Sequence, residues 1–404
     1  MIPVEEARAR ITAAFEPLPA ETVALSLALG RTLAEDLTAR VTQPPQDVSA
    51  MDGYAVRAAD VATVPARLKV VGRVPAGGAF AGEVGPGEAV RIFTGATVPA
   101  GADAIVIQEN TESEGDSVLV KEGAPAGRFV RPAGLDFRAG EVGLPAGRLL
   151  TARDIGLAAA MNRPWLPVRR RPRIALLGTG DEVVLPGDAP GPNQIVGSNS
   201  FSLAAFVTAC GGVPVNLGVV PDEPAALATG VARARGADLL VTTGGVSVGE
   251  HDLVRDVLGD QGLKLDFWRI AMRPGKPLLF GRVGATPVLG LPGNPVSTVV
   301  CATVFLRPAI AVMLGRPASE AQQDSAILAS DLPANDRRQD YLRAELSIDE
   351  AGRRLAVPFS RQDSSMLAML ARADCLIVRP PFAEAASAGT VVPILPLKGG
   401  VLGI

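Results

Sequence analysis

Five short polar segments in the middle of the chain constrain its fold most, because each follows an apolar run, where a β-strand should end. They are Thr179-Gly180-Asp181-Glu182, Pro221-Asp222-Glu223, Thr242 to Asp252, Arg273-Pro274-Gly275-Lys276-Pro277, and Leu291 to Ser297. Strands that alternate with helices predict a doubly wound parallel sheet, and such sheets bind ligands at the carboxyl ends of their strands. The five segments therefore predict one site for an anionic, metal-bound ligand.

Length and charge limit the class of protein. A chain of 404 residues is too long for one ordinary core, and its net charge of −3 gives no overall attraction to nucleic acid or acidic membranes. Its N-terminus lacks the basic and apolar regions of a secretory signal. The most apolar stretch, Val299 to Leu314, is interrupted by Arg307-Pro308 and is shorter than the ~20 residues of a membrane helix. We expect a cytoplasmic protein without nucleic-acid or membrane partners.

The composition and the hydrophobic pattern of the sequence change three times along the chain. Residues 46–137 alternate glycine, proline and valine in short runs, which predicts a β-rich domain. From residue 172 to 318 apolar runs alternate with helical patterns, which predicts the α/β domain. Residues 319–404 return to short strands and predict a small C-terminal β domain. The basic run Arg169 to Arg173 marks a domain boundary, since no aromatic residue interrupts it as in a nucleic-acid surface.

Two glycine turns in the α/β domain are suited to binding an anion. Gly244-Gly245-Val246-Ser247 lets backbone N–H groups approach a ligand, and a following helix start adds donors and a favourable dipole. Pro292-Gly293-Asn294-Pro295 is a second such turn, with Pro295 at the first helical position and Ser297 in the first helical turn. Each alone could be a capped turn, but two in one domain favour an anion site.

Charged residues in the same segments come in two groups. Arg273 and Lys276 flank Pro274-Gly275 and could address one oxyanion, although a solvated surface pair is the alternative. Carboxylates come from three strand ends, namely Asp181, Glu182, Asp222 and Asp252. Converging carboxylates repel one another unless a cation compensates, and beside a phosphate site that cation would be Mg²⁺. If the acids do not converge, they are helix caps and no metal is expected.

Several common enzyme classes are excluded by missing motifs. The chain has no GxxxxGK[ST] loop of a Walker-type NTPase. Gly178-Thr179-Gly180 begins like a dinucleotide fingerprint, but Val183 stands at the third glycine position. The one histidine, His251, is expected at the surface.

Taken together, six strings resemble the MoeA family, the molybdopterin molybdenumtransferases, which includes the gephyrin E domain and its plant counterpart. They are SAMDGYAV from Ser49, TGATVP from Thr94, TGDE from Thr179, TTGGVSVGE-x-D from Thr242, PGKP from Pro274 and LPGNPVS from Leu291, in family order. The resemblance implies insertion of molybdate into adenylylated molybdopterin with release of AMP, the last step of molybdenum cofactor assembly, with Mg²⁺. It also implies transient contacts with the adenylyltransferase and with acceptor molybdoenzymes.

The resemblance further implies four domains in an elongated homodimer. A linking domain would comprise residues 1–45 and 138–171, followed by the β-rich domain (46–137), the α/β molybdopterin-binding domain (172–318) and a C-terminal β-barrel (319–404). The cleft would combine the α/β domain of one subunit with the β-rich domain of the other, so that Asp52 and Thr94 could share a site with Glu182.

Residue roles carried over by the resemblance fall into four sets. The catalytic set is Asp52, Thr94, Glu182, Asp222 and Asp252, of which Glu182, Asp222 and Asp252 would hold the metal. The molybdopterin set is Thr179, Gly180, Asp181, Ser198, Asn199, Gly244, Gly245, Ser247, Pro292, Gly293, Asn294, Arg131 and Asp136. The molybdate set is Arg273, Lys276, Pro277, Ser297, Arg343 and Ser364.

Two departures and two rival functions accompany this interpretation. Many relatives carry Lys where Arg273 stands, and Gly-Glu-Asp where this chain has Gly134-Leu135-Asp136. A molybdopterin adenylyltransferase shares the α/β domain but usually lacks the flanking domains. A scaffold of the gephyrin E type would lose several cleft acids and cations, nearly all of which are present here.

Overall fold

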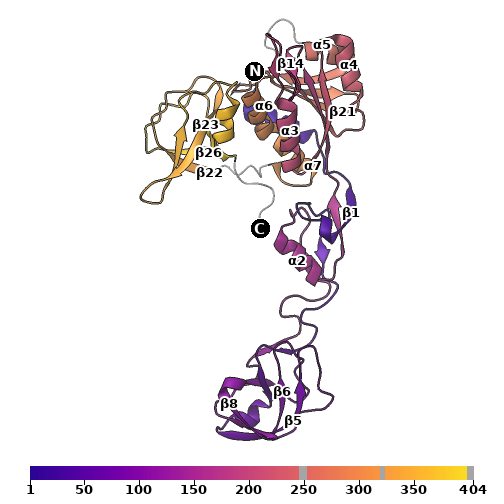
Figure 1. The fold of residues 1–404 in the computed structure, drawn as a ribbon, viewed down its shortest axis with the longest axis vertical. Helices are drawn as coiled ribbons and strands as arrows, with labels where there is room; N and C mark the ends of the chain where they lie inside the picture. The colour runs from indigo at the N-terminus through magenta and orange to yellow at the C-terminus, as the bar shows by residue number, and fades with distance from the viewer. Residues whose placement is uncertain (245–252, 319–323, 398–404) are drawn as a thin grey trace.

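The computed structural model is an elongated molecule with four bodies (Figure 1). It describes residues 1–244, 253–318 and 324–397. The α/β domain and the C-terminal domain lie side by side at one end, and the β-rich domain lies at the opposite end. A small linking domain joins the two ends, so the chain leaves and re-enters the α/β half through it.

The α/β domain is built on one six-stranded sheet. Its strands are β13 (Arg173–Thr179), β16 (Val213–Val220), β17 (Leu239–Thr243), β18 (Leu263–Trp268), β20 (Leu279–Val283) and β21 (Thr286–Leu291), in the order β16-β13-β17-β21-β20-β18. The first four strands of this order are mutually parallel, and β20 is antiparallel to both its neighbours. The predicted α/β fold is confirmed, but the sheet is mixed rather than wholly parallel because β20 forms a tight hairpin with β21.

Helices cover both faces of this sheet, as the doubly wound pattern predicts. They are α1 (Val4–Ala13), α3 (Asn199–Ala209), α4 (Pro224–Ala232), α5 (Leu253–Asp260), α6 (Pro295–Cys301) and α7 (Arg307–Met313). Alternate strand residues face opposite cores, so that Ile174 and Leu176 join the cluster with α3, α6 and α7 while Ala175 and Leu177 join the cluster with α4 and α5.

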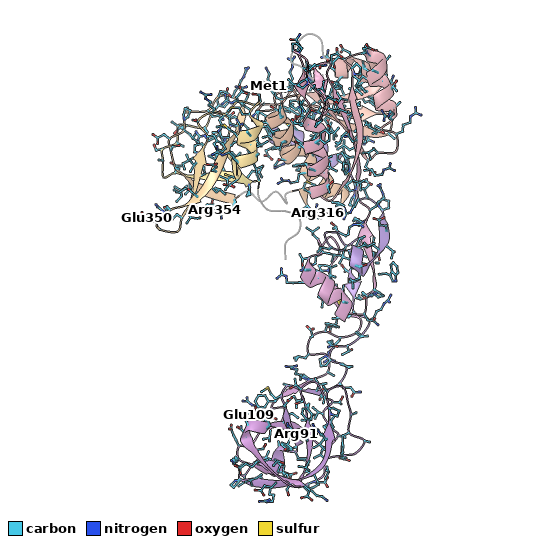
Figure 2. The ribbon with its side chains drawn as sticks, in the orientation of Figure 1. Met1, Arg91, Glu109, Arg316, Glu350 and Arg354 are labelled. Carbon is cyan, nitrogen blue, oxygen red and sulfur yellow. The ribbon has the colours of Figure 1, made fainter. Side chains whose placement is uncertain are left out.

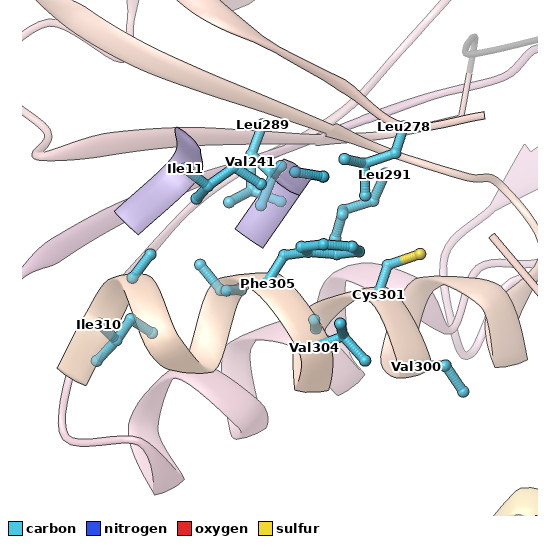
Figure 3. Packing of buried hydrophobic residues seen from close by; sticks show 14 of the residues in the cluster. Ile11, Val241, Leu278, Leu289, Leu291, Val300, Cys301, Val304, Phe305 and Ile310 are labelled. Atoms are coloured by element: carbon cyan, nitrogen blue, oxygen red, sulfur yellow. The ribbon is translucent and has the colours of Figure 1, made fainter. Parts of the chain in front are cut away.

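A continuous helical stretch, Pro295–Met313, passes through the centre of the larger core. It joins α6 to α7 through a π-helical turn, Ala302–Leu306, which ends two residues before Pro308, whose ring has no N–H for the preceding turn. Its 19 residues are long and apolar enough to cross a membrane by length and composition, which corrects the expectation that this stretch is too short. The stretch is 83% buried inside the molecule, however, and Phe305 packs beneath the sheet (Figure 3).

The first helix belongs to the α/β core, although the sequence placed residues 1–45 in the linking domain. Val4, Ala7 and Ile11 form a buried stripe on α1, and Ile11 lies beside the sheet residues in Figure 3. An N–H···O bond from Ile2 to Arg269 ties the terminus to the same domain. The sequence pattern of residues 4–14 predicts a short amphipathic helix, but the apolar spacing of three and four residues does not specify the surface that it covers.

The linking domain has a small core of its own. Its elements are β1 (Ala20–Ala24), β2 (Leu37–Thr38), β11 (Val142–Leu144), α2 (Ala152–Ala160) and β12 (Trp165–Arg169), with a 3-10 turn at Leu25–Leu27. β1 pairs with β12 and β2 with β11, both antiparallel. The sequence pattern of residues 151–161 predicts a helix, and α2 is present there, beginning with a capping box between Thr151 and Asp154.

The β-rich domain is a six-stranded sheet in the order β7-β4-β6-β5-β9-β8. Its strands are β4 (Gly53–Val56), β5 (Ala66–Val74), β6 (Glu88–Ile92), β7 (Ala104–Ile107), β8 (Thr111–Glu114) and β9 (Ser117–Val120), with 3-10 turns at Ala58–Val61 and Gln108–Asn110. A separate pair, β3 (Val48–Ser49) and β10 (Val130–Arg131), lies where the chain enters and leaves the domain. The short apolar runs at residues 68–71, 89–92, 104–107 and 117–120 predict strands, and all four coincide with strands of this sheet.

The C-terminal domain is a closed β-barrel, as predicted. Its elements are β22 (Asp324–Leu328), β23 (Gln339–Ile348), β24 (Arg354–Pro358), α8 (Leu367–Arg372), β25 (Cys375–Arg379) and β26 (Val391–Pro396). β23 pairs with both β24 and β25, which closes the sheet. A two-residue strand of the α/β domain, β19 (Met272–Arg273), pairs in parallel with β23 and joins the two domains.

Candidate functional site

A cavity of about 560 Å³ lies at the carboxyl ends of β13, β17 and β21. This first cavity is lined by three strand ends, by the start of α3 and α6, and by one residue of the C-terminal domain: Gly178, Thr179, Glu182, Val183, Ile195, Val196, Gly197, Ser198, Asn199, Ser200, Val219, Thr243, Gly244, Pro277, Pro292, Gly293, Asn294, Pro295 and Ser365. Its position agrees with the rule for open α/β sheets. Predicted residues from four of the five polar segments meet here.

Polar groups form the floor of the first cavity. The Asn199 amide donates to Thr243 Oγ1 (3.0 Å) and to the Gly293 carbonyl (2.7 Å), so one side chain joins two strand-end loops. Thr179 Oγ1 and Thr242 Oγ1 are buried and have no hydrogen-bond partner in the described part of the chain. Thr179 lines the cavity, and an unpaired buried hydroxyl is a group that a polar ligand could satisfy.

The two glycine turns approach each other at this floor. Gly244 has φ +90°, and a Cβ there would lie 2.3 Å from the Thr179 carbonyl oxygen. A Cβ on Gly293 would meet Gly244 Cα at 3.5 Å, an ordinary contact. Gly244 is therefore required by the backbone, whereas Gly293 leaves room for a ligand. Gly245 and Ser247, predicted for the same turn, lie outside the described residues.

Three carboxylates line one edge of the sheet, which we call the acidic edge: Asp181, Glu182 and Asp222. All three are exposed, and the Asp222 N–H donates to Asp181 Oδ1 (3.0 Å). Partial loss of water raises the pKa of Asp222, and repulsion by Asp181 and Glu182 raises it further. The Thr179 hydroxyl lies near Asp222 without reaching hydrogen-bond geometry, and it offsets the rise in the pKa of Asp222 only in part. Asp181 and Glu182 therefore lie close enough to Asp222 to affect its charge, which agrees with the expectation that these acids converge.

The acidic edge does not form a metal-binding cluster of three side chains. Within residues 1–244, 253–318 and 324–397, no group of three or more His, Cys, Asp or Glu side chains could hold a metal ion. Mg²⁺ commonly takes only one or two carboxylates and completes its shell with water and substrate phosphates. Mutual repulsion at Asp222 is the kind of strain that such a cation relieves. Asp252, the third predicted ligand, lies outside the described residues.

Arg273 is held by the C-terminal domain. Its guanidinium forms a two-pronged ion pair with Asp340, a residue of β23 that is only 3% exposed, through Nε (2.8 Å) and Nη2. Further bonds reach Asn335 and Asp336. Arg273 does not line the first cavity, although Pro277, four residues later, does. Lys276 is half-buried and makes no ion pair with any described residue, so it is the freer cation of this segment.

Arg343, predicted to bind molybdate, is 1% exposed and does not line the first cavity. Its guanidinium donates to Gln362 Oε1 (3.2 Å) and to the carbonyls of Met366 (3.2 Å) and Asp363 (2.9 Å). These partners belong to residues 359–366, which we call the C-terminal loop. In this structure Arg343 therefore lies beneath that loop instead of facing the cavity.

Ser364, another predicted molybdate ligand, lies where the C-terminal loop meets α6. Its Oγ accepts from the Asn294 amide (2.8 Å), and its carbonyl accepts from the Val296 N–H (3.1 Å). Ser297 is buried in the first turn of α6. Ser364 thus stands at the mouth of the cavity, with its neighbour Ser365 in the lining.

Asp52 and Thr94 of the β-rich domain lie at the opposite end of the chain from the first cavity (Figure 1). Asp52 Oδ1 accepts from the Thr94 N–H and from Thr94 Oγ1, both at 2.8 Å. These two bonds, with the charge of Arg91, lower the pKa of Asp52. Arg91 is labelled on this domain in Figure 2. Within one chain these residues cannot share a site with Glu182.

Arg131 and Asp136 line a second cavity, of about 740 Å³, between the β-rich and linking domains. Gly95, next to Thr94, lines it too, so the four predicted residues of this region are neighbours. Leu135 is 59% exposed on the same wall.

Sequence reasoning missed an apolar wall and an ion-pair partner. Val183 in β14 (Val183–Val184) and Ile195 and Val196 in β15 (Ile195–Val196) line the first cavity, and the latter two are about half exposed. Apolar side chains left in water beside a polar floor suit a flat heterocycle. Asp340 could have been suspected as an ion-pair partner only because it lies in a buried strand, since Arg273 is 67 residues away in the sequence.

Comparison with known proteins covers the whole chain. The MoeA N-terminal region (domain I and II) matches residues 2–162, a probable molybdopterin binding domain matches residues 175–312, and the MoeA C-terminal region (domain IV) matches residues 325–397. A molybdopterin molybdenumtransferase of Nostoc sp. is 37% identical over 93% of this chain and 88% of its own length. Molybdopterin molybdenumtransferase 2 of Mycobacterium tuberculosis is 38% identical over 92% of this chain and 94% of its own length.

Two solved structures of MoeA proteins from Pyrococcus horikoshii match with TM-scores of 0.86 and 0.85, at 31% and 28% identity. They cover 99% and 98% of this chain and all of their own chains. Sequence and fold thus agree over every domain, with relatives well above 30% identity over nine-tenths of the chain. The chain belongs to the MoeA family.

Proposed function

We propose that this protein inserts molybdate into adenylylated molybdopterin and releases AMP. The observation that carries this proposal is the first cavity, where an acidic edge, a buried polar floor and two glycine turns meet in one member of the MoeA family. A pterin phosphate joined to AMP is a polyanion that needs such turns and a cation. The curated relatives are named molybdopterin molybdenumtransferase, which supports the same reaction.

In this proposal Glu182 and Asp222, with Asp252, would hold Mg²⁺ near the substrate phosphates. The metal supplies charge neutralisation when the bond between the two phosphates breaks. Asp222 favours the bound cation because its own charge is strained by Asp181 and Glu182. Asn199, Gly244 and Gly293 orient the polyanion on the floor, and Lys276, Ser297 and Ser364 provide the oxyanion side. Catalysis is then mainly positional and electrostatic.

The β-rich domain would enter the reaction through a second copy of the chain. Asp52 and Thr94 lie far from the first cavity of their own chain, and a homodimer would bring them to the cavity of the partner. Arg131 and Asp136, which line the second cavity, would then face the first cavity of the partner subunit. The dimer would act in the cytoplasm, with transient contacts to the adenylyltransferase and to acceptor molybdoenzymes.

The test is AMP release from adenylylated molybdopterin with Mg²⁺, with and without molybdate, together with activation of an apo-molybdoenzyme. Molybdate-dependent release with active cofactor is expected. Release that needs ATP and molybdopterin instead would identify an adenylyltransferase. Ligand binding without release would identify a scaffold.

The dimer is tested by mixing two inactive variants, Asp52→Asn and Asp222→Asn. If the site is shared between subunits, co-refolded mixed dimers contain one intact site and recover activity that neither variant has alone. No recovery in a preparation shown to contain mixed dimers would place both residues in sites of one chain and contradict the shared cleft.

A further inference from the structure

The strand β18 forms one edge of the α/β sheet, at the end opposite β16. In the described part of the chain its backbone pairs only with β20, so the N–H and C=O groups that point away from β20 have no strand beside them. An edge with such groups is a template for pairing with another extended segment.

The same edge already accepts an added segment just beyond β18. Ile2 forms a parallel bridge with Ile270, in which the Ile2 N–H donates to the Arg269 carbonyl (3.3 Å) and the Ile2 carbonyl accepts from the Ala271 N–H (2.9 Å). The N-terminal segment of the chain therefore covers the edge at residues 269–271. The preceding stretch, residues 263–268, is left without such a partner in the described part of the chain.

A third cavity, of about 400 Å³, lies beside this stretch on the face of the sheet that α1 covers. Its walls carry Arg10 of α1, Lys264 and Asp266 of β18 and Arg282 of β20, and its floor includes the apolar ring of Phe280. Three cations therefore surround one carboxylate.

The charges of the third cavity are only partly compensated. Asp266 accepts from Arg10 (3.0 Å), so the one carboxylate is already engaged. Lys264 is exposed and makes no ion pair with any described residue. The Arg282 guanidinium donates to the backbone carbonyl of Ala285 (2.7 Å), which leaves its charge uncompensated. Two cations of this cavity are therefore available to an anion.

These two cations oppose each other across the sheet. Lys264 and Arg282 are direct partners in the antiparallel pair of β18 with β20, and like charges directly opposite each other are destabilising. Edge strands often carry a lysine or a bulge that discourages pairing, and β18 has both, with its register shifting between Leu265 and Phe267. Such protection does not account for a second cation on β20, which lies inside the sheet. An anion beside both cations would offset their repulsion.

We propose that an acidic, extended segment of a partner protein adds to the outer edge of β18 as a further strand. Its backbone would pair with the open groups of Leu263–Trp268, and its carboxylates would lie toward Lys264 and Arg282 in the third cavity. Leu265, which points to the opposite face and is 45% exposed, would meet the alternate, apolar side chains of the segment. Because the whole chain carries a net charge of −3, this local basic surface gives selectivity for acidic segments.

Binding of a labelled peptide that alternates Glu and Val to the full-length protein tests this by fluorescence anisotropy. We expect binding at low salt that weakens about 10-fold or more in Lys264→Glu and in Arg282→Glu, since each change turns an attraction into a repulsion. Lys69→Glu makes the same charge change on β5, which has strands on both sides, and should bind like the wild type. No binding by the wild type, or equal binding by all variants, would overturn the proposal.

A second set of peptides separates backbone pairing from charge. N-methylation of either the valines or the glutamates keeps every carboxylate and removes the N–H donors of one edge of the peptide. One of the two methylated peptides should bind about 10-fold more weakly or worse, because strand addition depends on main-chain hydrogen bonds. Amide exchange within Leu263–Trp268 should slow when the unmodified peptide binds. Equal affinity of all three peptides, or their displacement by an equal concentration of inorganic phosphate, would identify a small-anion site and refute strand addition.

Three controls use the Lys264→Glu protein. Its thermal unfolding midpoint should not fall, because the change removes a like-charge pair, and a lower midpoint would remove the repulsion on which the proposal rests. Sedimentation should show the same oligomeric state as the wild type, whereas a change would make a second copy of this chain the occupant and contradict an acidic partner. AMP release should equal that of the wild type, since the first and third cavities share no residue. Peptide binding and the proposed reaction therefore succeed or fail independently, and a loss of AMP release in this variant would contradict a separate docking surface.

Discussion

The acids and the arginines of the predicted site differ in what they contact. At the acidic edge, Asp181, Glu182 and Asp222 are exposed, and burial together with repulsion by Asp181 and Glu182 raises the pKa of Asp222. Arg273 and Arg343, which do not line the first cavity, are already engaged, by Asp340 and by the C-terminal loop. An unsatisfied group is available for a ligand, whereas a satisfied one organises the protein. In the proposed function the acids are therefore the groups available to a cation, although acids and arginines look alike in the sequence.

The largest effect is expected at the acidic edge. Asp222→Asn keeps the size of the side chain but removes its charge, and we expect AMP release to fall on the order of 100- to 1,000-fold with a higher Mg²⁺ requirement. Steady-state kinetics against Mg²⁺ concentration checks this. Glu223→Gln, at the adjacent exposed carboxylate, is the matched control and should retain activity. Equal losses in both variants would show that general charge, not the acidic edge, matters.

A large effect on stability is expected at one glycine turn and not at the other. Gly244→Ala places a Cβ 2.3 Å from the Thr179 carbonyl oxygen at φ +90°, so we expect a loss of roughly 3 kcal/mol in the free energy of unfolding. Gly293→Ala meets only an ordinary 3.5 Å contact and should cost less than about 0.5 kcal/mol. Denaturant unfolding distinguishes the two, and similar losses would contradict a backbone requirement confined to Gly244.

Local sequence patterns predicted much of the fold because each element carries its own signal. The α/β alternation, the four β-rich strands and the helix beginning at Pro295 each follow from apolar spacing or turn residues. β20 is not predicted, because its five residues follow a proline-rich turn and its antiparallel pairings with β21 and β18 are set by the tertiary structure. The packing of α1 in the α/β core was not predicted, because an apolar stripe does not specify the core against which a helix packs.

For the candidate site, the sequence predicted which segments meet but not which side chains are already paired. Thr179, Gly244 and Gly293 line the cavity, where the rule for strand ends predicts a ligand site, whereas Asn199, at the start of α3, was named only by the family resemblance. Arg273 and Arg343 could not be separated from free cations, because their partners lie in another domain or in a loop about 20 residues away. Whether a charged side chain is already paired depends on the tertiary structure, so it cannot be predicted from motif spacing.

A moderate effect tests whether Arg273 builds the interdomain contact. Asp340→Asn removes the buried carboxylate that holds this half-exposed guanidinium, and we expect a loss of about 1–2 kcal/mol in the free energy of unfolding. Glu345→Gln breaks the exposed pair with Arg372 in the same barrel and should cost less than about 0.5 kcal/mol. If Asp340→Asn instead left stability intact and weakened only molybdate use, Arg273 would belong with the binding groups.

The smallest effect contrasts two carboxylates of the predicted catalytic set, whose pKa values move in opposite directions. The Thr94 backbone N–H and then its hydroxyl lower the pKa of Asp52, while partial burial and then Asp181 and Glu182 raise that of Asp222. Thr94→Val removes one of the two bonds to Asp52. We expect its pKa to rise but to stay below the ordinary value, because the backbone bond remains. Carboxyl NMR titration of both residues measures this.

The sign of each shift fixes how each group contributes to stability with pH. Asp52, with its pKa lowered by folding, stabilises the fold above its unfolded pKa and loses that contribution as pH falls through the folded value. Asp222, with its pKa raised, does the reverse, since its ionisation opposes folding as pH rises from the unfolded pKa through the folded value. Mg²⁺ should therefore lower the pKa of Asp222 and leave that of Asp52 in the free chain unchanged. A magnesium-induced shift at Asp52 alone would move the metal from the acidic edge to the β-rich domain.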